Sequence, residues 1–258
     1  MEDFAASFAE RGYLAIDRLF DPALIAAIHD EYRRQFGSLD LDCLPPHLEV
    51  GDRRVQMPIE LAGPLLDPMF TANPLLLRMV ETILDLDPLI DSFTCVTAFP
   101  GAKDQRVHAD HPQLFPSEPG AAALPCFALT VAVPLIELTP ETGSTRVFPG
   151  THLRWPEPGT KPGPGEGEIG YARRGGCYFM DYRLWHQGTA NRSAEPRPVL
   201  YIIYARPWFT DLKNFSTHAR LLLSKENALA MPSRQRRLFR RIAAKGELDM
   251  TEAELLAS

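Results

Sequence analysis

The spacing of apolar residues predicts helices near the start of the chain. A helix over Asp3–Arg11 is followed by a short strand, Tyr13–Ile16. A second helix begins at Asp21-Pro22, because aspartate caps helices well and proline suits the first helical position. The same apolar spacing predicts a further helix over residues 73–86.

From residue 90 to residue 207 the apolar residues recur at every second position, which is typical of strands. The predicted strands are Ile90–Phe99, Arg106–His108, Phe127–Leu135, Thr145–Phe148, Cys177–Asp181 and Val199–Ala205. Several short strands joined by turns are typical of a double-sheet jelly roll. The sequence therefore predicts a mainly β fold with flanking helices, whose core is a cupin-like jelly roll (a double-stranded β-helix).

Helical spacing returns over residues 217–258, where the basic stretch Arg234–Arg241 indicates a solvated helical face or an oligomer contact. The segment Glu157–Gly167 is rich in proline and glycine, and we interpret it as an exposed loop because strand-like sequence follows it. We predict one domain over residues 1–258. Its parts are a helical N-terminal part (about 1–88), a jelly-roll core (about 89–207) and a C-terminal helical tail (about 208–258).

Composition narrows the class of partner. The 258 residues carry a net charge of −6, whereas binding to nucleic acid or to an anionic membrane requires an excess of basic residues. The four cysteines form no CxxC pair, and no run approaches the roughly 20 apolar residues of a membrane span. The N-terminus lacks the apolar run of a signal peptide. These features predict a cytoplasmic protein that acts on a small molecule, and they leave the oligomeric state open.

A short motif, His108-Ala-Asp110, is the clearest candidate for a metal site. On an extended strand these two side chains would point to the same face. Two histidines and one carboxylate on one side of a metal leave three positions open, which is the arrangement of non-haem Fe(II) oxygenases. His186 is the candidate for the second histidine. His111 would point to the opposite face of the strand, and we interpret it as structural or as a residue that supports the metal ligands.

Arg197 begins an alternating run that continues through Val199 and Ile203. If these two residues face the barrel interior, the arginine does so as well. A guanidinium group inside an apolar barrel is costly unless it meets an anion, and its planar fork matches a carboxylate. The sequence leaves two partners open: a carboxylate of a bound molecule, or an internal Asp or Glu of this chain.

The order of these motifs resembles the phytanoyl-CoA dioxygenase family of Fe(II)/2-oxoglutarate oxygenases. The resemblance rests on the HxD pair, on Glu141-Thr-Gly143 and Phe148-Pro-Gly-Thr-His152, and on His186-x-Gly-x-Asn-x-Ser-x-x-x-Arg197. It covers about residues 4–206. His152 in the proline-glycine turn is interpreted as a loop residue rather than a ligand.

The resemblance implies that His108, Asp110 and His186 hold Fe(II) and that Arg197 binds the distal carboxylate of 2-oxoglutarate. Gln105 and Thr130 are further candidates for the co-substrate pocket. The sequence departs from the family at two positions. Many members carry an aromatic residue where this chain has Ala132, and some carry a hydroxyl residue where it has Gly188. These departures concern the secondary contacts with 2-oxoglutarate, not the metal triad.

The implied activity is oxidation of a C–H bond of a small molecule with Fe(II), 2-oxoglutarate and O2, and with release of succinate and CO2. Hydroxylation is favoured over halogenation, because related halogenases have a small residue in the place of Asp110. Two alternatives remain open: a cupin-type metalloenzyme that does not use 2-oxoglutarate, and a non-catalytic binding protein on the same barrel. The intact triad together with Arg197 argues against both.

The substrate side of the site is less defined by the sequence. An acyl-CoA would require basic residues at the mouth, for which the candidates are Arg53, Arg54, Lys103, Arg173 and Arg174. The net negative charge favours a small metabolite or natural-product intermediate instead. Candidates for lining a substrate cavity are Phe99, Phe115, Trp155, Trp185 and Trp208. Asp40–Met57 and His111–Leu124 are candidate lids, because both are rich in proline or glycine and adjoin the proposed metal.

Overall fold

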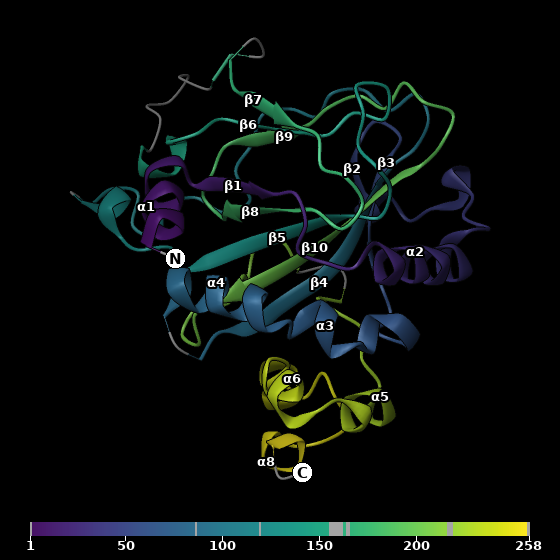
Figure 1. Ribbon diagram of the computed structural model, residues 1–258, viewed down its shortest axis with the longest axis vertical. Coiled ribbons are helices and arrows are strands. Elements are labelled where there is room, and N and C mark those ends of the chain that lie inside the picture. The colour runs from purple at the N-terminus through teal and green to yellow at the C-terminus, as the bar shows by residue number, and fades with distance from the viewer. Residues whose placement is uncertain are drawn as a thin grey trace.

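The structure is a computed structural model that describes residues 2–85, 87–118, 120–154, 162–163, 166–215 and 219–256. A large antiparallel sheet faces a small one, and helices cover the outer face of the large sheet (Figure 1). The large sheet has the strand order β1-β8-β5-β10-β4-β3-β2, and the small sheet has the order β7-β6-β9. The predicted jelly-roll fold with flanking helices is therefore confirmed.

The strands of both sheets are short, and several are far apart in the sequence. The large sheet contains β1 (Tyr13–Ile16), β2 (Glu49–Gly51), β3 (Arg54–Pro58), β4 (Leu89–Ala98), β5 (Ala128–Pro134), β8 (Cys177–Asp181) and β10 (Arg197–Ala205). The small sheet contains β6 (Thr145–Val147), β7 (Glu168–Gly170) and β9 (His186–Gly188). The segment predicted as a helical N-terminal part thus contributes three strands to the large sheet.

Helices lie at both ends of the chain, and the three that the sequence predicts in the N-terminal part begin within one residue of the predicted start. The N-terminal ones are α1 (Glu2–Arg11), α2 (Pro22–Phe36), α3 (Pro68–Thr71) and α4 (Pro74–Leu84). Asp21 caps α2 by accepting a hydrogen bond from Ala23 N at 2.8 Å. The C-terminal ones are α5 (Lys225–Ala230), α6 (Ser233–Arg237), α7 (Arg240–Ala244) and α8 (Glu252–Leu256). No helix in the described part of the chain is long and apolar enough to span a bilayer.

The predicted strand Arg106–His108 is wrong. Only His108 pairs with a neighbouring strand, through an isolated antiparallel bridge to His186. Gln105 N, three residues earlier, donates to Gly188 O at 2.8 Å, although Gly188 lies only two residues beyond His186. The extra residue on the His108 side works like a β-bulge, so the segment follows β9 without forming a continuous ladder.

Residues of β10 alternate between the two faces of the large sheet. Leu200, Ile202 and Tyr204 point outward into the main core, where they join the apolar residues of α4. Val199 faces the space between the two sheets. Because Arg197 is two residues before Val199, it faces the same space, as the alternation predicts. This inner space holds the candidate site.

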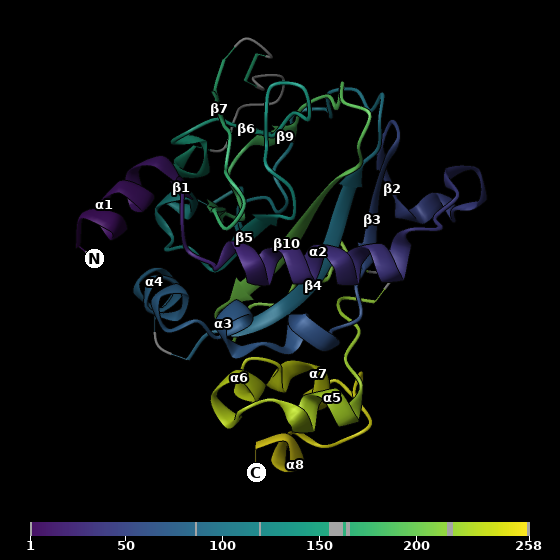
Figure 2. The ribbon, with the colours of Figure 1, turned by 45° about the vertical axis from the view of Figure 1, so that its right-hand side comes forward.

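The C-terminal arginines differ from the prediction of a solvated face. Arg236, Arg240 and Arg241 are buried, and Arg241 forms an ion pair with Asp91 on β4. Arg220 also pairs with Asp91, at 2.8 Å. Because these guanidinium groups meet a buried carboxylate and backbone carbonyl groups, they can leave water. They help to fix the cluster of C-terminal helices that Figure 2 shows below α3.

Candidate active site

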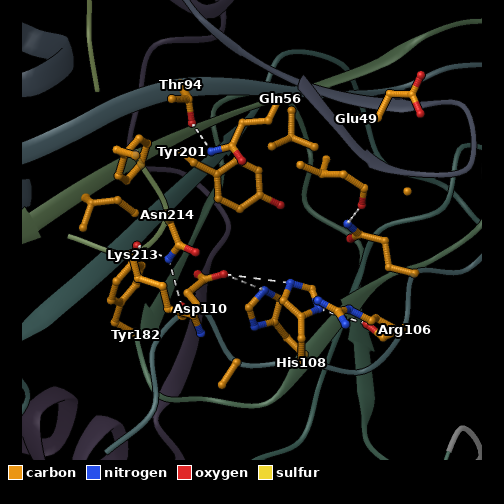
Figure 3. Close-up of a pocket in the computed structure, with 18 of the residues that line it drawn as sticks. Glu49, Gln56, Thr94, Arg106, His108, Asp110, Tyr182, Tyr201, Lys213 and Asn214 are labelled. Atoms are coloured by element: carbon orange, nitrogen blue, oxygen red, sulfur yellow. Dashed lines mark hydrogen bonds and ion pairs between the residues drawn. The ribbon is translucent and has the colours of Figure 1, made fainter. Parts of the chain in front are cut away.

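His108, Asp110 and His186 come together in the space between the sheets. The backbone bridge between the two histidines places their ring centroids 4.4 Å apart. Asp110 Oδ1 lies 3.6 Å from His186 Nε2 and 3.9 Å from His108 Nε2 (Figure 3). One potential ligand atom from each residue lies within 4.8 Å of the other two. A single ion with bonds of about 2.1 Å could therefore contact all three.

Both imidazole rings are oriented by backbone carbonyl groups. His108 Nδ1 lies 2.9 Å from Arg106 O, and His186 Nδ1 lies 3.0 Å from Leu184 O. These bonds leave each Nε2 available as a metal ligand. Burial, together with the nearby His186, lowers the pKa of His108 to about 4. The His108 ring is therefore neutral at physiological pH, as metal ligation requires.

The triad opens into a cavity of about 600 Å³. This volume is in the range of small-molecule sites. Its wall carries apolar groups, represented by Val96 and Ile203, and two tyrosines, Tyr182 and Tyr201. Charged side chains reach it as well: Glu49, Asp52, Asp104, Arg106 and Lys213. The cavity thus combines an apolar surface with groups of both charges (Figure 3).

A recess beside this cavity contains two buried guanidinium groups. Arg197 is 5% exposed and Arg54 only 1% exposed. Arg197 Nη1 donates to Thr189 O at 3.0 Å, and Arg54 Nη2 donates to the same oxygen at 2.9 Å. Tyr201 and Gln105 line both the recess and the main cavity, so the two spaces adjoin.

Neither guanidinium group has an acidic partner in the described part of the chain. No Asp or Glu in the described part of the chain forms an ion pair with Arg54 or Arg197. Burial, and then the charge of Arg54, lowers the pKa of Arg197 to about 10. Of the two partners that the sequence leaves open, an internal acidic residue has no support among the described residues. Two buried cations with no ion-pair partner among the described residues fit an anionic ligand.

The two family departures have a structural explanation. A Cβ atom at position 188 would lie 2.6 Å from Gln105 Oε1 and 2.7 Å from Arg54 Nη1, so these side chains occupy the place of a larger residue. Ala132 pairs across the sheet with Tyr178 on one side and Tyr201 on the other. In this chain, therefore, the aromatic groups beside the recess come from the neighbouring strands.

The two further co-substrate candidates lie in different places. Gln105 lines the recess, but its amide is engaged within the protein: it donates to Val50 O at 2.8 Å and accepts from Gly188 N at 3.0 Å. Thr130 pairs with Ile203 and Met180 and is fully buried, yet it lines neither the cavity nor the recess. The structure thus brings Gln105, but not Thr130, to the pocket wall.

The sequence does not predict that Arg54 lies in the recess beside Arg197. The sequence makes it a candidate for a basic patch at the mouth, but it is buried and donates to backbone carbonyl groups. A signal was present, since Val55 and Met57 are core residues and their neighbours Arg54 and Gln56 therefore alternate to the other face. Arg173 and Arg174 are exposed and do not line the cavity.

The aromatic candidates for the cavity wall are also wrong where the structure describes them. Phe99, Phe115, Trp185 and Trp208 do not line the cavity, and Trp155 lies outside the described residues, as does most of the loop Glu157–Gly167. The lining aromatic residues are instead Tyr182, Tyr201 and Phe215. Strand register and a C-terminal loop place these three at the cavity, and neither can be read from local spacing.

The lid candidates contribute unequally to the cavity. Within Asp40–Met57, the β2–β3 hairpin supplies Glu49 to Asp52 and Gln56 to the wall. The described residues of His111–Leu124 supply none. His111 packs with its ring edge-on against Phe127 and Phe209, in agreement with its interpretation as structural.

Gly143→Ala tests how tightly the recess is built. Gly143 has a φ of 73°, and a Cβ atom there would overlap Ala190 O and Arg197 Nη1. Because backbone atoms cannot yield cheaply, we expect a loss of stability of about 2 kcal/mol or more, from strain at positive φ and from this overlap. Thermal unfolding measures this loss. Gly246→Ala is the matched control, since Gly246 has a φ of 70° but no atom near its Cβ position.

Comparison with known proteins gives three kinds of similarity. The family model described as "Phytanoyl-CoA dioxygenase (PhyH)" matches residues 8–199. Dioxygenase af480 of Aspergillus fumigatus is 29% identical over 151 residues, which are 56% of this chain and 46% of that protein. Dioxygenase andF of Emericella variicolor is 33% identical over 98 residues, 38% of this chain and 34% of that protein. The matched region thus spans less than half the length of these curated relatives.

Solved structures share the fold at low sequence identity. The epimerase SnoN from nogalamycin biosynthesis, in complex with Fe3+, alpha ketoglutarate and nogalamycin RO, has a TM-score of 0.61 and 21% identity, covering 80% of this chain and 83% of that one. HygX from Streptomyces hygroscopicus, with nickel, 2-oxoglutarate and hygromycin B bound, has a TM-score of 0.63 and 16% identity, covering 86% and 96%. At these identities the similarity shows the fold.

Proposed function

Because the chain belongs to the phytanoyl-CoA dioxygenase family, we propose that it is an Fe(II)- and 2-oxoglutarate-dependent oxygenase that hydroxylates a C–H bond of a small molecule. One observation carries the proposal. An open triad of two histidines and a carboxylate adjoins a recess with two buried guanidinium groups that no described acidic residue neutralises. A molecule with a metal-chelating end and a carboxylate at the other end fits both features.

In this proposal His108, Asp110 and His186 hold Fe(II). The donor set fits this metal, because imidazole and carboxylate ligands on one side leave positions for a chelating co-substrate and O2. Bound iron supplies the coupling of O2 activation to oxidative decarboxylation of 2-oxoglutarate, which releases succinate and CO2.

The recess would bind the distal carboxylate of 2-oxoglutarate. Both hydrogen bonds from Arg197 to described residues start at Nη1, so Nη2 and Nε keep donors for a ligand. Arg54 adds a second positive charge beside it. Tyr201 lines both spaces, and its hydroxyl group adds a neutral polar contact between them. Together these groups would orient the co-substrate.

The remaining cavity would hold the substrate. HygX is described with hygromycin B bound, and SnoN with nogalamycin RO, so related folds accept polyfunctional small molecules. The mixed apolar and charged wall supports the same class here. An acyl-CoA is disfavoured, because Arg54 is buried and Arg173 and Arg174 do not line the cavity.

The test is an anaerobic titration of the metal-free protein with Fe(II) and then with 2-oxoglutarate. We expect a weak visible charge-transfer band that needs both additions, and succinate formation when O2 is admitted. Succinate in place of 2-oxoglutarate is the control, since it lacks the keto group and should give no band. Iron binding without the band would favour a metalloenzyme that does not use the keto acid. Absence of iron binding would favour a non-catalytic binding protein.

A further inference from the structure

Residues beyond the part matched by the family model complete one wall of the cavity. The match ends at residue 199, whereas Lys213, Asn214 and Phe215 line the cavity. These residues follow β10 and precede the C-terminal helices. This loop therefore lies in the part of the chain that the family model does not match.

Asn214 contacts the backbone of a proposed metal ligand. Its Nδ2 donates to Asp110 O at 2.9 Å (Figure 3) and also to Asp211 Oδ2 at 2.7 Å. The Asp211 carboxylate also accepts from Tyr182 OH at 2.5 Å and from the backbone N of Asn214 at 3.0 Å. Both the main chain and the side chain of Asn214 are thus held by Asp211.

Asp211 is itself firmly anchored. It is fully buried, and its backbone N donates to Asp91 Oδ2 at 3.3 Å. Arg220 donates to Asp211 O and pairs with Asp91. Burial raises the pKa of Asp211, but the hydrogen bonds from Tyr182 and Asn214 outweigh burial, so its pKa lies below the usual value. The ionised carboxylate is therefore a strong and fixed acceptor.

Asp110 lies outside the regular strands, so contacts other than a β ladder must fix its backbone. No hydrogen bond from a described residue reaches its carboxylate, and its backbone lies outside the strands. The backbone around it is fixed at two points: Asn214 bonds to Asp110 O, and His111 N donates to Tyr182 O at 3.0 Å. Tyr182 and Asn214 meet at the same Asp211 carboxylate.

We propose that Asn214 is a positioning residue, which, held by Asp211 and Tyr182, fixes the backbone of Asp110 so that its carboxylate points at the metal. The inference rests on the proposed function in that Asp110 is taken as a ligand. Groups that orient metal ligands in this way contribute about 10- to 100-fold to metal affinity. The loop after β10 then contributes to the metal affinity of the site as well as to one wall of the cavity.

The experiment measures Ni(II) affinity by calorimetry on wild type, Asn214→Ala and Asn214→Asp, with thermal unfolding of each. We expect Asn214→Ala to bind Ni(II) about tenfold more weakly. Asn214→Asp should bind more weakly still, because it keeps the shape but replaces the donating NH2 group with a carboxylate oxygen that faces two oxygen acceptors. Asn214 is exposed, so neither change should prevent folding. The KM for 2-oxoglutarate should stay within about twofold, because the arginine recess is untouched.

Asn227→Ala is the matched control. It removes an equivalent bond, from Asn227 Nδ2 to Leu61 O at 3.0 Å, in the same C-terminal part but far in the chain from Asp110. It should leave Ni(II) affinity unchanged. Equal affinity of wild type and both Asn214 variants would overturn the positioning role. Absence of Ni(II) binding by the wild type would instead overturn the proposed function, and this inference with it.

Discussion

His186→Ala should reduce 2-oxoglutarate-dependent succinate formation to background, a loss of about three orders of magnitude or more, because acceleration of this size depends on the bound metal. His186 supplies one of three candidate ligands, and its ring is held by Leu184 O. The anaerobic charge-transfer band should disappear as well. Both readouts are made on one preparation whose folding is checked by circular dichroism.

The control for this prediction is His29→Ala. His29 is a half-buried histidine on α2, stacked against Tyr32 and outside the cavity. The His29→Ala substitution removes an imidazole, as His186→Ala does, but leaves the triad intact, so activity should persist. Wild-type succinate formation by His186→Ala would contradict the metal assignment directly, because two remaining ligands would not hold the ion in the required geometry.

The parts of this site that the sequence predicts are those that depend on local alternation. The inward direction of Arg197 follows from its place in an apolar run with period two, and β10 keeps that period along its inner face. The jelly roll follows from the same periodicity repeated over several strands. Helix starts follow from local capping, as at Asp21. Each of these properties is decided by neighbours within a few residues.

The parts that the sequence does not predict depend on pairing between distant segments. Arg54 belongs to the site because β3 pairs with β4 about forty residues later, which turns its side chain toward Thr189 O. Thr130 faces inward as predicted, but the cross-strand register places it between Ile203 and Met180 and away from the cavity wall.

The same reason explains the errors at His108 and in the C-terminal part. An extra residue beside β9 prevents a continuous strand at His108, yet the bridge to His186 still brings the histidine into place. Asn214 reaches the site only because Asp211 is anchored to Asp91 on β4. The basic stretch Arg234–Arg241 is likewise predicted to be solvated, because the sequence does not show that the fold places the buried Asp91 beside Arg241.

Arg197→Leu should raise the KM for 2-oxoglutarate about a hundredfold. A hydrogen bond to a charged group contributes about 1.5–3 kcal/mol, and each 1.4 kcal/mol is a factor of ten. At saturating 2-oxoglutarate much of the kcat should return, because the metal ligands are unchanged. Arg197→Lys should lie between wild type and Arg197→Leu, since it keeps the charge but loses the planar fork. Steady-state succinate formation measures all three.

Stability without 2-oxoglutarate separates a ligand-binding arginine from a structural one. Arg183 is also buried but pairs with Asp181 at 2.8 Å, so Arg183→Leu leaves a buried carboxylate unpaired and should cost about 3–5 kcal/mol. Among the described residues, Arg197→Leu gives up only bonds to Thr142 O and Thr189 O, and it also relieves the repulsion between Arg197 and Arg54. The ligand-free Arg197→Leu protein should therefore unfold within a few degrees of wild type, yet lose the stabilisation that 2-oxoglutarate and Ni(II) together give. Unfolding as severe as that of Arg183→Leu would mean that the arginine supports the fold and that the anion of the recess must be sought elsewhere.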